Sequence, residues 1–315
     1  MAARALRRSR HFSSYAALSA GVLAFSTSGA LTKLTSAPSV TIAFWVRVFS
    51  LAYLVAMFLF HNRRRRGDLL AGAWPHGLAA GLIFGVHILL YFWALKLTSV
   101  TVVFLLGALN PAVVGVFGWL FLNERLRPSQ AFWTAMAIVA AIFVVVQRDA
   151  SGGLPLFGNL VALVASLGYC AYFLVSRHAR RSIGTTEFLV VATVVSMAVA
   201  GAAGFVGGVS LGMEPRDFWI AALLGLIPGT IGHLTVSWAL RHVEAHAAST
   251  VLLAVPMFAS LWAYLLVGER IALGQIVAGA VVLLAIPGAI RRPDVPPTFE
   301  PIPQPLDGTV DRAVT

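Results

Sequence analysis

Long apolar runs separated by short polar connectors dominate the pattern of this 315-residue chain. A helix needs about 20 mainly apolar residues to cross the hydrocarbon of a bilayer. Runs bounded by charge, proline or glycine clusters predict ten transmembrane helices that pack as antiparallel neighbours. The ten predicted spans are 15–34, 39–60, 74–95, 99–122, 129–147, 156–176, 186–208, 218–240, 246–267 and 271–290.

Composition supports a membrane protein, since 59% of the residues are hydrophobic and only 11% are charged. A soluble domain has about 25% charged residues. The formal charge of +11 comes from arginines in short clusters between apolar runs. That placement is typical of topology signals, so we expect the lipid bilayer as a partner and no nucleic acid. The one cysteine, Cys170, excludes an intrachain disulfide.

The lysines and arginines predict that both termini are cytoplasmic, in a multi-pass protein of the inner or plasma membrane. The N-terminus resembles a signal peptide, but we expect an uncleaved first helix. With a cytoplasmic N-terminus, only five basic residues face outward, and Arg47 lies inside a span. The other 17 face inward: Arg4, Arg7, Arg8, Arg10, Arg63, Arg64, Arg65, Arg66, Arg125, Arg127, Arg177, Arg180, Arg181, Arg241, Arg291, Arg292 and Arg312.

The two halves of the chain repeat one another. An offset of 145 residues superposes Trp74 on Trp219, two "WAL" triplets, Pro111 on Pro256 and two "ER" pairs without a gap. Because each half has five helices, the second half enters the membrane from the opposite side, as in inverted-repeat transporters. The predicted parts are a basic cytoplasmic N-terminus (1–14), two repeats (15–147 and 156–290), a linker (148–155) and a disordered cytoplasmic tail (291–315).

Four segments carry a family resemblance. "LNPAVVGVFGWLFLNERLRPSQ" and "VPMFASLWAYLLVGERIALGQ" resemble the fourth-helix ends of the two repeats in EamA-type transporters of the drug/metabolite transporter superfamily. "FWVRVF" is similar to the arginine-bearing second helix, and "GNLVALVASLGYCAYFLVSRHARR" to the opening of the second repeat. The resemblance spans residues 15–290 and implies a ten-helix carrier that exports amino acids, metabolites or drugs by alternating access.

Arg47 is the arginine within a span, and no acidic residue lies in the interior of any predicted span to pair with it. A buried guanidinium usually faces a cavity, a counter-charge or backbone carbonyls. We therefore predict that Arg47 binds an anionic substrate, with snorkelling to the outer headgroups as the alternative. In the second half Ala192 stands at the equivalent position, so this role is confined to the first half.

Histidines and aromatic residues in the third and eighth helices are further candidates. His87 and His233 are 146 residues apart, one more than the repeat offset, so they need not face the same way. Each is a candidate for proton coupling, because histidine titrates near neutral pH, or for a neutral hydrogen bond between helices. Tyr91, Trp93 and Trp238 are candidate substrate-binding residues, with packing as the alternative.

Prolines and glutamates mark candidate moving parts. Pro111 and Pro256 each remove a helix hydrogen bond and predict hinges. Asn110 precedes the first proline, whereas Val255 precedes the second, so the two halves differ in chemistry at this point. Asn110 is therefore a candidate substrate ligand. Small residues four apart in "GLIFG" (81–85) and "GLIPG" (225–229) predict close helix contacts. Glu124 and Glu269 end the equivalent helices as candidate gates, with a structural role as the alternative.

The pattern predicts a secondary transporter that exports a small polar metabolite such as an amino acid, without a cofactor. Protons are the candidate coupling ion; a cationic or multidrug exporter and a passive facilitator or channel are the alternatives. No enzyme is expected: "GVSLG" (208–212) lacks a strand-to-helix elbow, and no Gly-Lys phosphate loop is present. "HVEAH" (242–246) lacks a third ligand besides Glu244, so no metal site is predicted.

Overall fold

The computed structural model describes residues 2–61, 66–110, 113, 116, 128–146, 155–179, 183–239, 252 and 254–289. All regular structure in these residues is helical, without a strand, which confirms the all-α class. The helices are α1 (Ala2–Lys33), α2 (Ser39–His61), α3 (Arg66–Leu97), α4 (Val100–Gly107), α6 (Pro128–Val146), α7 (Leu156–Ala179), α8 (Thr185–Val206), α9 (Pro215–Leu226), the π-helix η1 (Ile227–Gly232), α10 (His233–Ala239), α12 (Ala254–Val267) and α13 (Leu273–Ala289).

Five helical stretches among the described residues are long and apolar enough to cross a membrane. They are Ser39–Phe60, Ala73–Leu97, Leu156–Ser176, Thr185–Val206 and Pro215–Val236. These stretches overlap five of the predicted spans, and the multi-pass character of the protein follows from them. The total of ten membrane helices stays a prediction.

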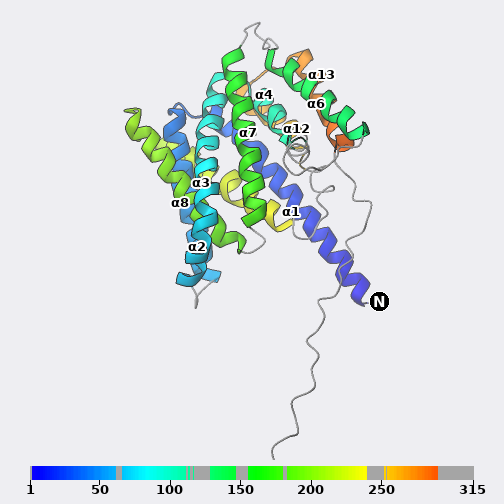
Figure 1. The fold of residues 1–315 in the computed structure, drawn as a ribbon. Coiled ribbons are helices and arrows are strands. Elements are labelled where there is room, and N and C mark those ends of the chain that lie inside the picture. Colours follow the sequence, from blue (N-terminus) through cyan, green and yellow to red (C-terminus); the bar gives the residue numbers. More distant parts are fainter. Residues whose placement is uncertain are drawn as a thin grey trace, which may run out of the picture.

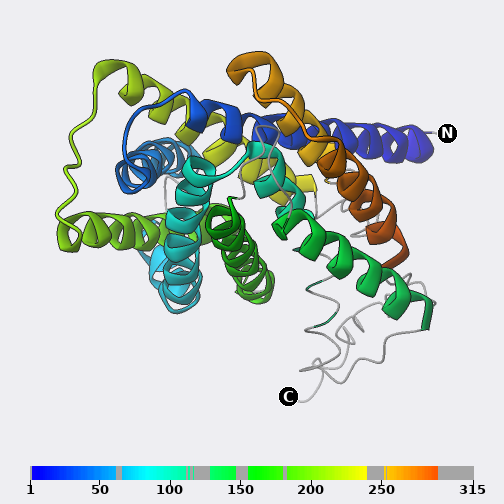
Figure 2. The same ribbon diagram turned by 90° about the horizontal axis from the view of Figure 1, so that it is seen from above.

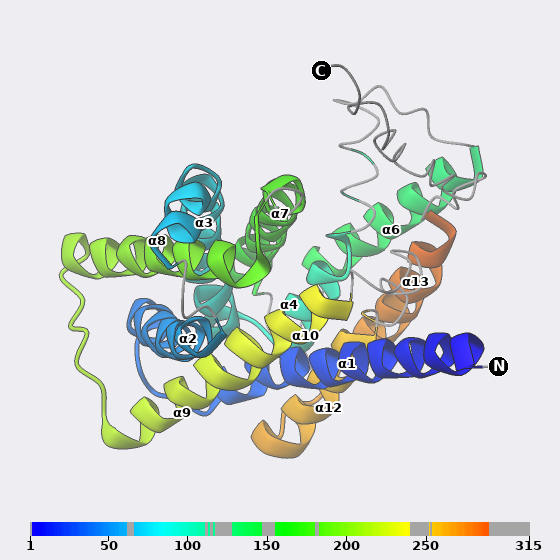
Figure 3. The same cartoon turned by 90° about the horizontal axis from the view of Figure 1, so that it is seen from below.

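Helix α3 lies at the centre of one group of helices. It packs along α7 and α8, and α2 packs along α8 and α9 (Figure 1). Helix α1 passes η1, α10 and α12, while α6 and α13 lie side by side away from α3 (Figure 2). Seen from below, α9, η1 and α10 follow one another along a continuous path that crosses beside α1 (Figure 3).

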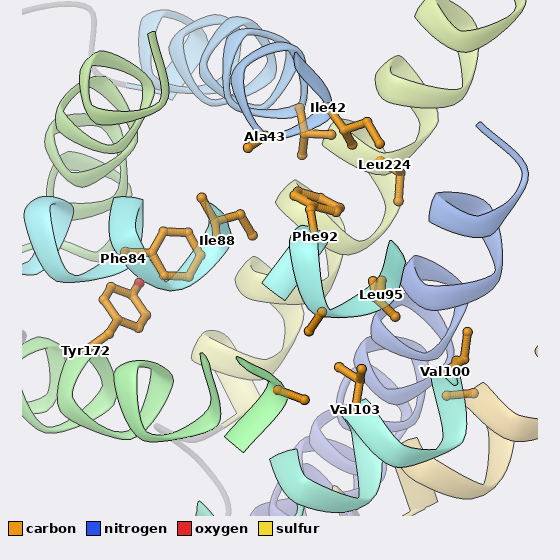
Figure 4. Close-up of a cluster of buried hydrophobic side chains, with 14 of the residues drawn as sticks. Ile42, Ala43, Phe84, Ile88, Phe92, Leu95, Val100, Val103, Tyr172 and Leu224 are labelled. Carbon is orange, nitrogen blue, oxygen red and sulfur yellow. The ribbon is translucent and has the colours of Figure 1, made fainter. Parts of the chain in front are cut away.

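The core around α3 is apolar and tightly packed. Phe92, Leu95, Val100 and Leu224 belong to a single cluster of buried side chains drawn from α3, α4 and α9 (Figure 4). The predicted close contact of "GLIFG" is confirmed, because a Cβ added to Gly81 would lie 2.5 Å from the Cβ of Val195 in α8. The small residue therefore lets the two helices approach closely.

The stretch predicted as one helix over 218–240 contains a π-helical turn instead. Pro228 lacks the backbone N–H that would bond to the carbonyl of Leu224 in a regular helix. The Gly225 carbonyl accepts hydrogen bonds from Thr230 Oγ1 at 2.8 Å and from Ser50 Oγ of α2 at 3.1 Å. The proline and these hydroxyls account for the wide turn, a feature frequent at functional sites.

Helix boundaries differ from the predicted ones in three further places. Helix α1 starts at Ala2 and α3 at Arg66, so both continue through basic segments that were predicted to lie before the apolar spans. Helix α4 ends at Gly107, and Ala108 and Leu109 form a turn immediately before Asn110. The linker 148–154 and the tail 291–315 lie outside the described residues.

Candidate functional site

Arg47 is buried inside the helix group, with 3% of its surface exposed. It lies eight residues after Ser39, the first residue of α2, which corresponds to roughly 12 Å along the helix axis. Its Nε atom has no hydrogen-bond partner, and no carboxylate among the described residues pairs with the guanidinium. Within the described part of the chain, the guanidinium therefore has no counter-charge.

The ring of Phe84 connects the candidate residues. The Cζ atom of Arg47 lies 5.2 Å from the centroid of this ring, a cation–π distance. The centroids of the His87 and His233 rings lie 5.4 and 5.7 Å from it. Tyr172 of α7 faces Phe84 at 4.5 Å (Figure 4). We call these five side chains the Phe84 cluster.

His87 is tied to α7 by its ring. Its Nδ1 lies 2.7 Å from the carbonyl oxygen of Ala165. The imidazole also contacts the rings of Tyr169 at 5.2 Å and Tyr91 at 5.9 Å between centroids. The side chain is 8% exposed. His87 is therefore a neighbour of Arg47 held in a fixed orientation.

Hydroxyl groups of α1 bind the aromatic side chains of other helices. Ser28 Oγ donates to the Phe25 carbonyl at 2.8 Å and lies 2.7 Å from the hydroxyl of Tyr91. Because Ser28 has a single hydroxyl hydrogen, Tyr91 is the donor of that second bond. Trp262 Nε1 of α12 donates to Ser26 Oγ at 3.1 Å. These bonds position α1 between α3 and α12.

Asn110 lies beside α7 rather than in the Phe84 cluster. Ser166 Oγ is 3.4 Å from Asn110 Oδ1 and donates to the Leu106 carbonyl at 2.8 Å. Cys170 Sγ donates to the backbone carbonyl of Asn110 at 3.5 Å. Ser166 follows Ala165, the partner of His87, so Asn110 is connected to the cluster through α7 and not by direct contact.

Other predicted residues are not brought to this cluster. Trp93 is 41% exposed and packs its ring against Phe157. Pro256 lies in the first turn of α12 as described, where a missing N–H has little cost. Pro111, Glu124 and the "HVEAH" segment lie outside the described residues, as does the side chain of Trp238.

Glu269 has a definite structural contact. Its carboxylate accepts hydrogen bonds from the backbone N–H groups of Val100 at 3.1 Å and Thr101 at 3.3 Å, at the start of α4. A carboxylate stabilises the positive end of a helix dipole. Glu269 therefore connects the segment after α12 to α4 across the two halves of the chain.

More polar contacts gather at this end of the molecule. Lys33 Nζ donates to the Thr98 carbonyl at 2.8 Å, and Lys96 Nζ donates to the Thr35 carbonyl. Asp217 Oδ2 accepts from the backbone N–H of Ser36 at 3.1 Å and of Ala37 at 3.0 Å. The ends of α1, α3 and α12 and the starts of α2, α4 and α9 are thus joined; we call this set of contacts, with Glu269, the end network.

Sequence reasoning did not predict Phe84, Tyr172 or Tyr169. Each is an aromatic residue in an apolar run, where packing is the ordinary role. One signal could have singled out Phe84, since it lies three residues before His87 and therefore on the same helix face. Tyr172 had no comparable signal, because its contact joins helices far apart in the sequence.

The spanning helices and their buried charge define a multi-pass helical membrane protein. The model of the EamA-like transporter family matches residues 13–146 and again residues 156–290. The chain belongs to the EamA-like transporter family, and the resemblance inferred from the motifs is confirmed. This membership identifies the protein as a membrane transporter.

Curated relatives agree with this assignment. The chain is 25% identical to the uncharacterized transporter YwfM of Bacillus subtilis (strain 168), over 68% of this chain and 72% of the relative. It is 28% identical to an uncharacterized transporter of Pseudomonas aeruginosa, over 72% of this chain and 74% of the relative. Neither description names a substrate.

A solved structure described as "Crystal structure of protein" shares the fold. Its TM-score is 0.61 at 20% sequence identity, and the alignment covers 90% of this chain and 97% of that one. At this identity the likeness extends to the fold alone.

Proposed function

We propose that this protein is a secondary transporter that exports a small carboxylate-bearing metabolite, such as an amino acid, by alternating access. The observation that carries the proposal is the buried Arg47, whose Nε lacks a hydrogen-bond partner. A buried guanidinium without a protein counter-charge is costly, and a substrate carboxylate would offset that cost. Arginine suits this role because its planar donors match a carboxylate in two parallel hydrogen bonds.

The surroundings of Arg47 favour an anionic or zwitterionic substrate over a cationic one. The described side chains of the Phe84 cluster contain one permanent cation and no carboxylate. A cationic drug would meet the field of Arg47 without a compensating negative group. The buried rings of Phe84 and Tyr172 make these surroundings apolar, which suits the remainder of the substrate.

Alternating access is supported by the position of the end network. It joins helix ends from both halves of the chain at one end of the molecule. Under the proposed topology this end faces outward, so these contacts close the outer side while the substrate is bound from inside. Glu269 acts as a gate in this proposal, because releasing its two bonds would free α4 from the segment after α12.

Counterflow in proteoliposomes tests the proposal. Vesicles containing the purified chain are loaded with unlabelled amino acids, a nucleoside or a cationic drug, and uptake of the corresponding labelled compound is measured. We expect saturable, trans-stimulated uptake of at least one amino acid. Arg47→Met should lower this uptake by about ten- to hundredfold, the size expected for losing hydrogen bonds to a charged group.

Controls separate the candidate functions. Size-exclusion profiles and thermal unfolding midpoints must show that Arg47→Met folds as the wild type does. The proposal would be contradicted if the cationic drug were the only compound taken up and if Arg47→Met left that uptake unchanged. A pH gradient across the same vesicles tests proton coupling, because coupled transport moves substrate against its own gradient and a facilitator or channel only equilibrates it.

Cysteine labelling tests the proposed orientation. In a Cys170→Ser background, an impermeant maleimide should react with Arg270→Cys from the outside of intact cells. Arg125→Cys should react only after the membrane is opened. The reverse pattern would place both termini outside and would contradict the direction of export.

A further inference from the structure

We infer that His87 determines substrate specificity: its Nε2 accepts a hydrogen bond from an N–H or O–H group of the substrate whose carboxylate Arg47 binds. The inference rests on the proposed function. It assigns to the substrate a second recognised group and therefore a narrower chemical class, a carboxylic acid with an amino or hydroxyl donor nearby.

The hydrogen bond of His87 to α7 fixes its tautomer. Nδ1 lies 2.7 Å from the Ala165 carbonyl oxygen, which has no hydrogen to donate. Nδ1 must therefore carry the ring hydrogen, and in a neutral imidazole Nε2 then has a free lone pair. A histidine held this way presents an acceptor in a constant direction.

We expect the ring to be neutral, because no described group near it stabilises a second positive charge. The charged and titratable groups around it are Arg47 from α2, Tyr91 from α3, Tyr169 and Tyr172 from α7, and His233 from α10. No carboxylate is among these groups. A buried cation that lacks a counter-charge and lies close to another cation is strongly disfavoured.

Two unsatisfied groups therefore lie around one aromatic ring. His87 Nε2 makes no hydrogen bond with the described residues, and Arg47 Nε has no partner. The guanidinium carbon is 5.2 Å and the imidazole centroid 5.4 Å from the Phe84 centroid. We expect a molecule of amino-acid size bound beside this ring to reach both groups. The buried rings of Phe84 and Tyr172 make the surroundings of both groups apolar.

Three probes with one carbon skeleton test the inference. L-phenylalanine carries an ammonium donor, L-phenyllactate a hydroxyl donor, and 3-phenylpropionate no donor beside its carboxylate. Equilibrium binding to the purified full chain in detergent is measured for each. We expect the first two to bind about tenfold more tightly than 3-phenylpropionate, because a missing donor leaves a buried acceptor unpaired.

Two substitutions separate the acceptor from the link to α7. The amide of His87→Gln reaches the position of Nε2 and can accept there, whereas that of His87→Asn overlays Nδ1 and can only preserve the bond to Ala165. We expect His87→Gln to retain a preference for the probes with donors. His87→Asn should lose that preference and bind all three probes alike. A purely structural role would give the opposite order.

The outcomes distinguish the inference from the proposed function. In one outcome, the wild type binds the three probes equally and Arg47→Met weakens the binding of all three. That result would refute the role of His87 and leave the carboxylate site intact. Wild-type binding that Arg47→Met does not weaken, or no binding of any probe, would contradict both. A preference retained by His87→Asn would also overturn the inference. The wild-type comparison needs no variant to fold.

Discussion

Helix α3 and the path α9–η1–α10 correspond to one another at the repeat offset of 145 residues, yet they differ in shape. Helix α3 is α-helical from Arg66 to Leu97, even though it contains Pro75. Its counterpart is interrupted by the π-helix Ile227–Gly232. Both nevertheless bring a histidine to the same ring, with centroids 5.4 Å (His87) and 5.7 Å (His233) from Phe84.

The difference bears on the spacing of His87 and His233 in the sequence. His87 and His233 are 146 residues apart, one more than the repeat offset, and in two regular helices that extra residue would rotate one ring by about 100° relative to the other. A π-helical turn absorbs one additional residue. The π-helix lies directly before His233, and we expect it to set the direction in which this ring points toward Phe84.

The largest effect on this comparison is expected from Pro228→Ala. Alanine restores the N–H that closes a regular turn with Leu224, so the π-helix should tighten and turn His233 away from Phe84. We expect the counterflow rate to fall about tenfold, which corresponds to about 1.4 kcal/mol. Pro75→Ala in α3 is the matched control and should leave the rate unchanged. Equal rates for the two variants would show that the π-helix has no part in transport.

A smaller effect is expected from Gly229→Ala. The added Cβ would lie 2.5 Å from Ser50 Oγ and 2.9 Å from the Leu224 carbonyl oxygen. Overpacking of this kind costs about 1–3 kcal/mol, so the thermal unfolding midpoint should fall by several degrees. Gly107→Ala is the control, because a Cβ there meets nothing within 4 Å. An unfolding midpoint of Gly229→Ala equal to that of the control would contradict the close packing of η1 on α2.

The smallest effect is expected from Ser50→Ala. Its hydroxyl is one of two side-chain donors to the Gly225 carbonyl, and Thr230 remains as the other. The loss should be about 0.5–1.5 kcal/mol of unfolding free energy, measured by denaturant titration. Thr230→Val should behave similarly, and the double variant should lose more than the sum because it removes both side-chain donors from a buried carbonyl. Strict additivity would argue that Gly225 does not need these donors.

The fold could be predicted from sequence where apolar length decides it. Runs such as 39–60 and 186–208 appear as helices α2 and α8 with nearly the predicted ends. The π-helix could not be predicted, because Pro228 alone indicates a kink and not which hydroxyls bond to the Gly225 carbonyl. That depends on Ser50, which is 175 residues away in sequence from Gly225.

Some residues of the candidate site could likewise be predicted from sequence, and others could not. Arg47 is conspicuous in sequence, since charge within an apolar span is rare and costly. His87, Tyr91 and His233 were also named from sequence, but the contact that brings His233 to Phe84 depends on helix packing. Trp93 was named for its residue type, but its side chain is exposed. The sequence pattern of an apolar helix does not say which of its faces points toward the site.

Equilibrium binding of L-phenylalanine and of L-phenylalaninamide to the purified chain tests the central claim most directly. L-phenylalaninamide differs from L-phenylalanine only in carrying a neutral carboxamide in place of the carboxylate. A site built around Arg47 should therefore bind the acid and reject the amide. Arg47→Met should abolish that difference. Tighter binding of the amide than of the acid, or an unchanged preference for the acid in Arg47→Met, would contradict the carboxylate site.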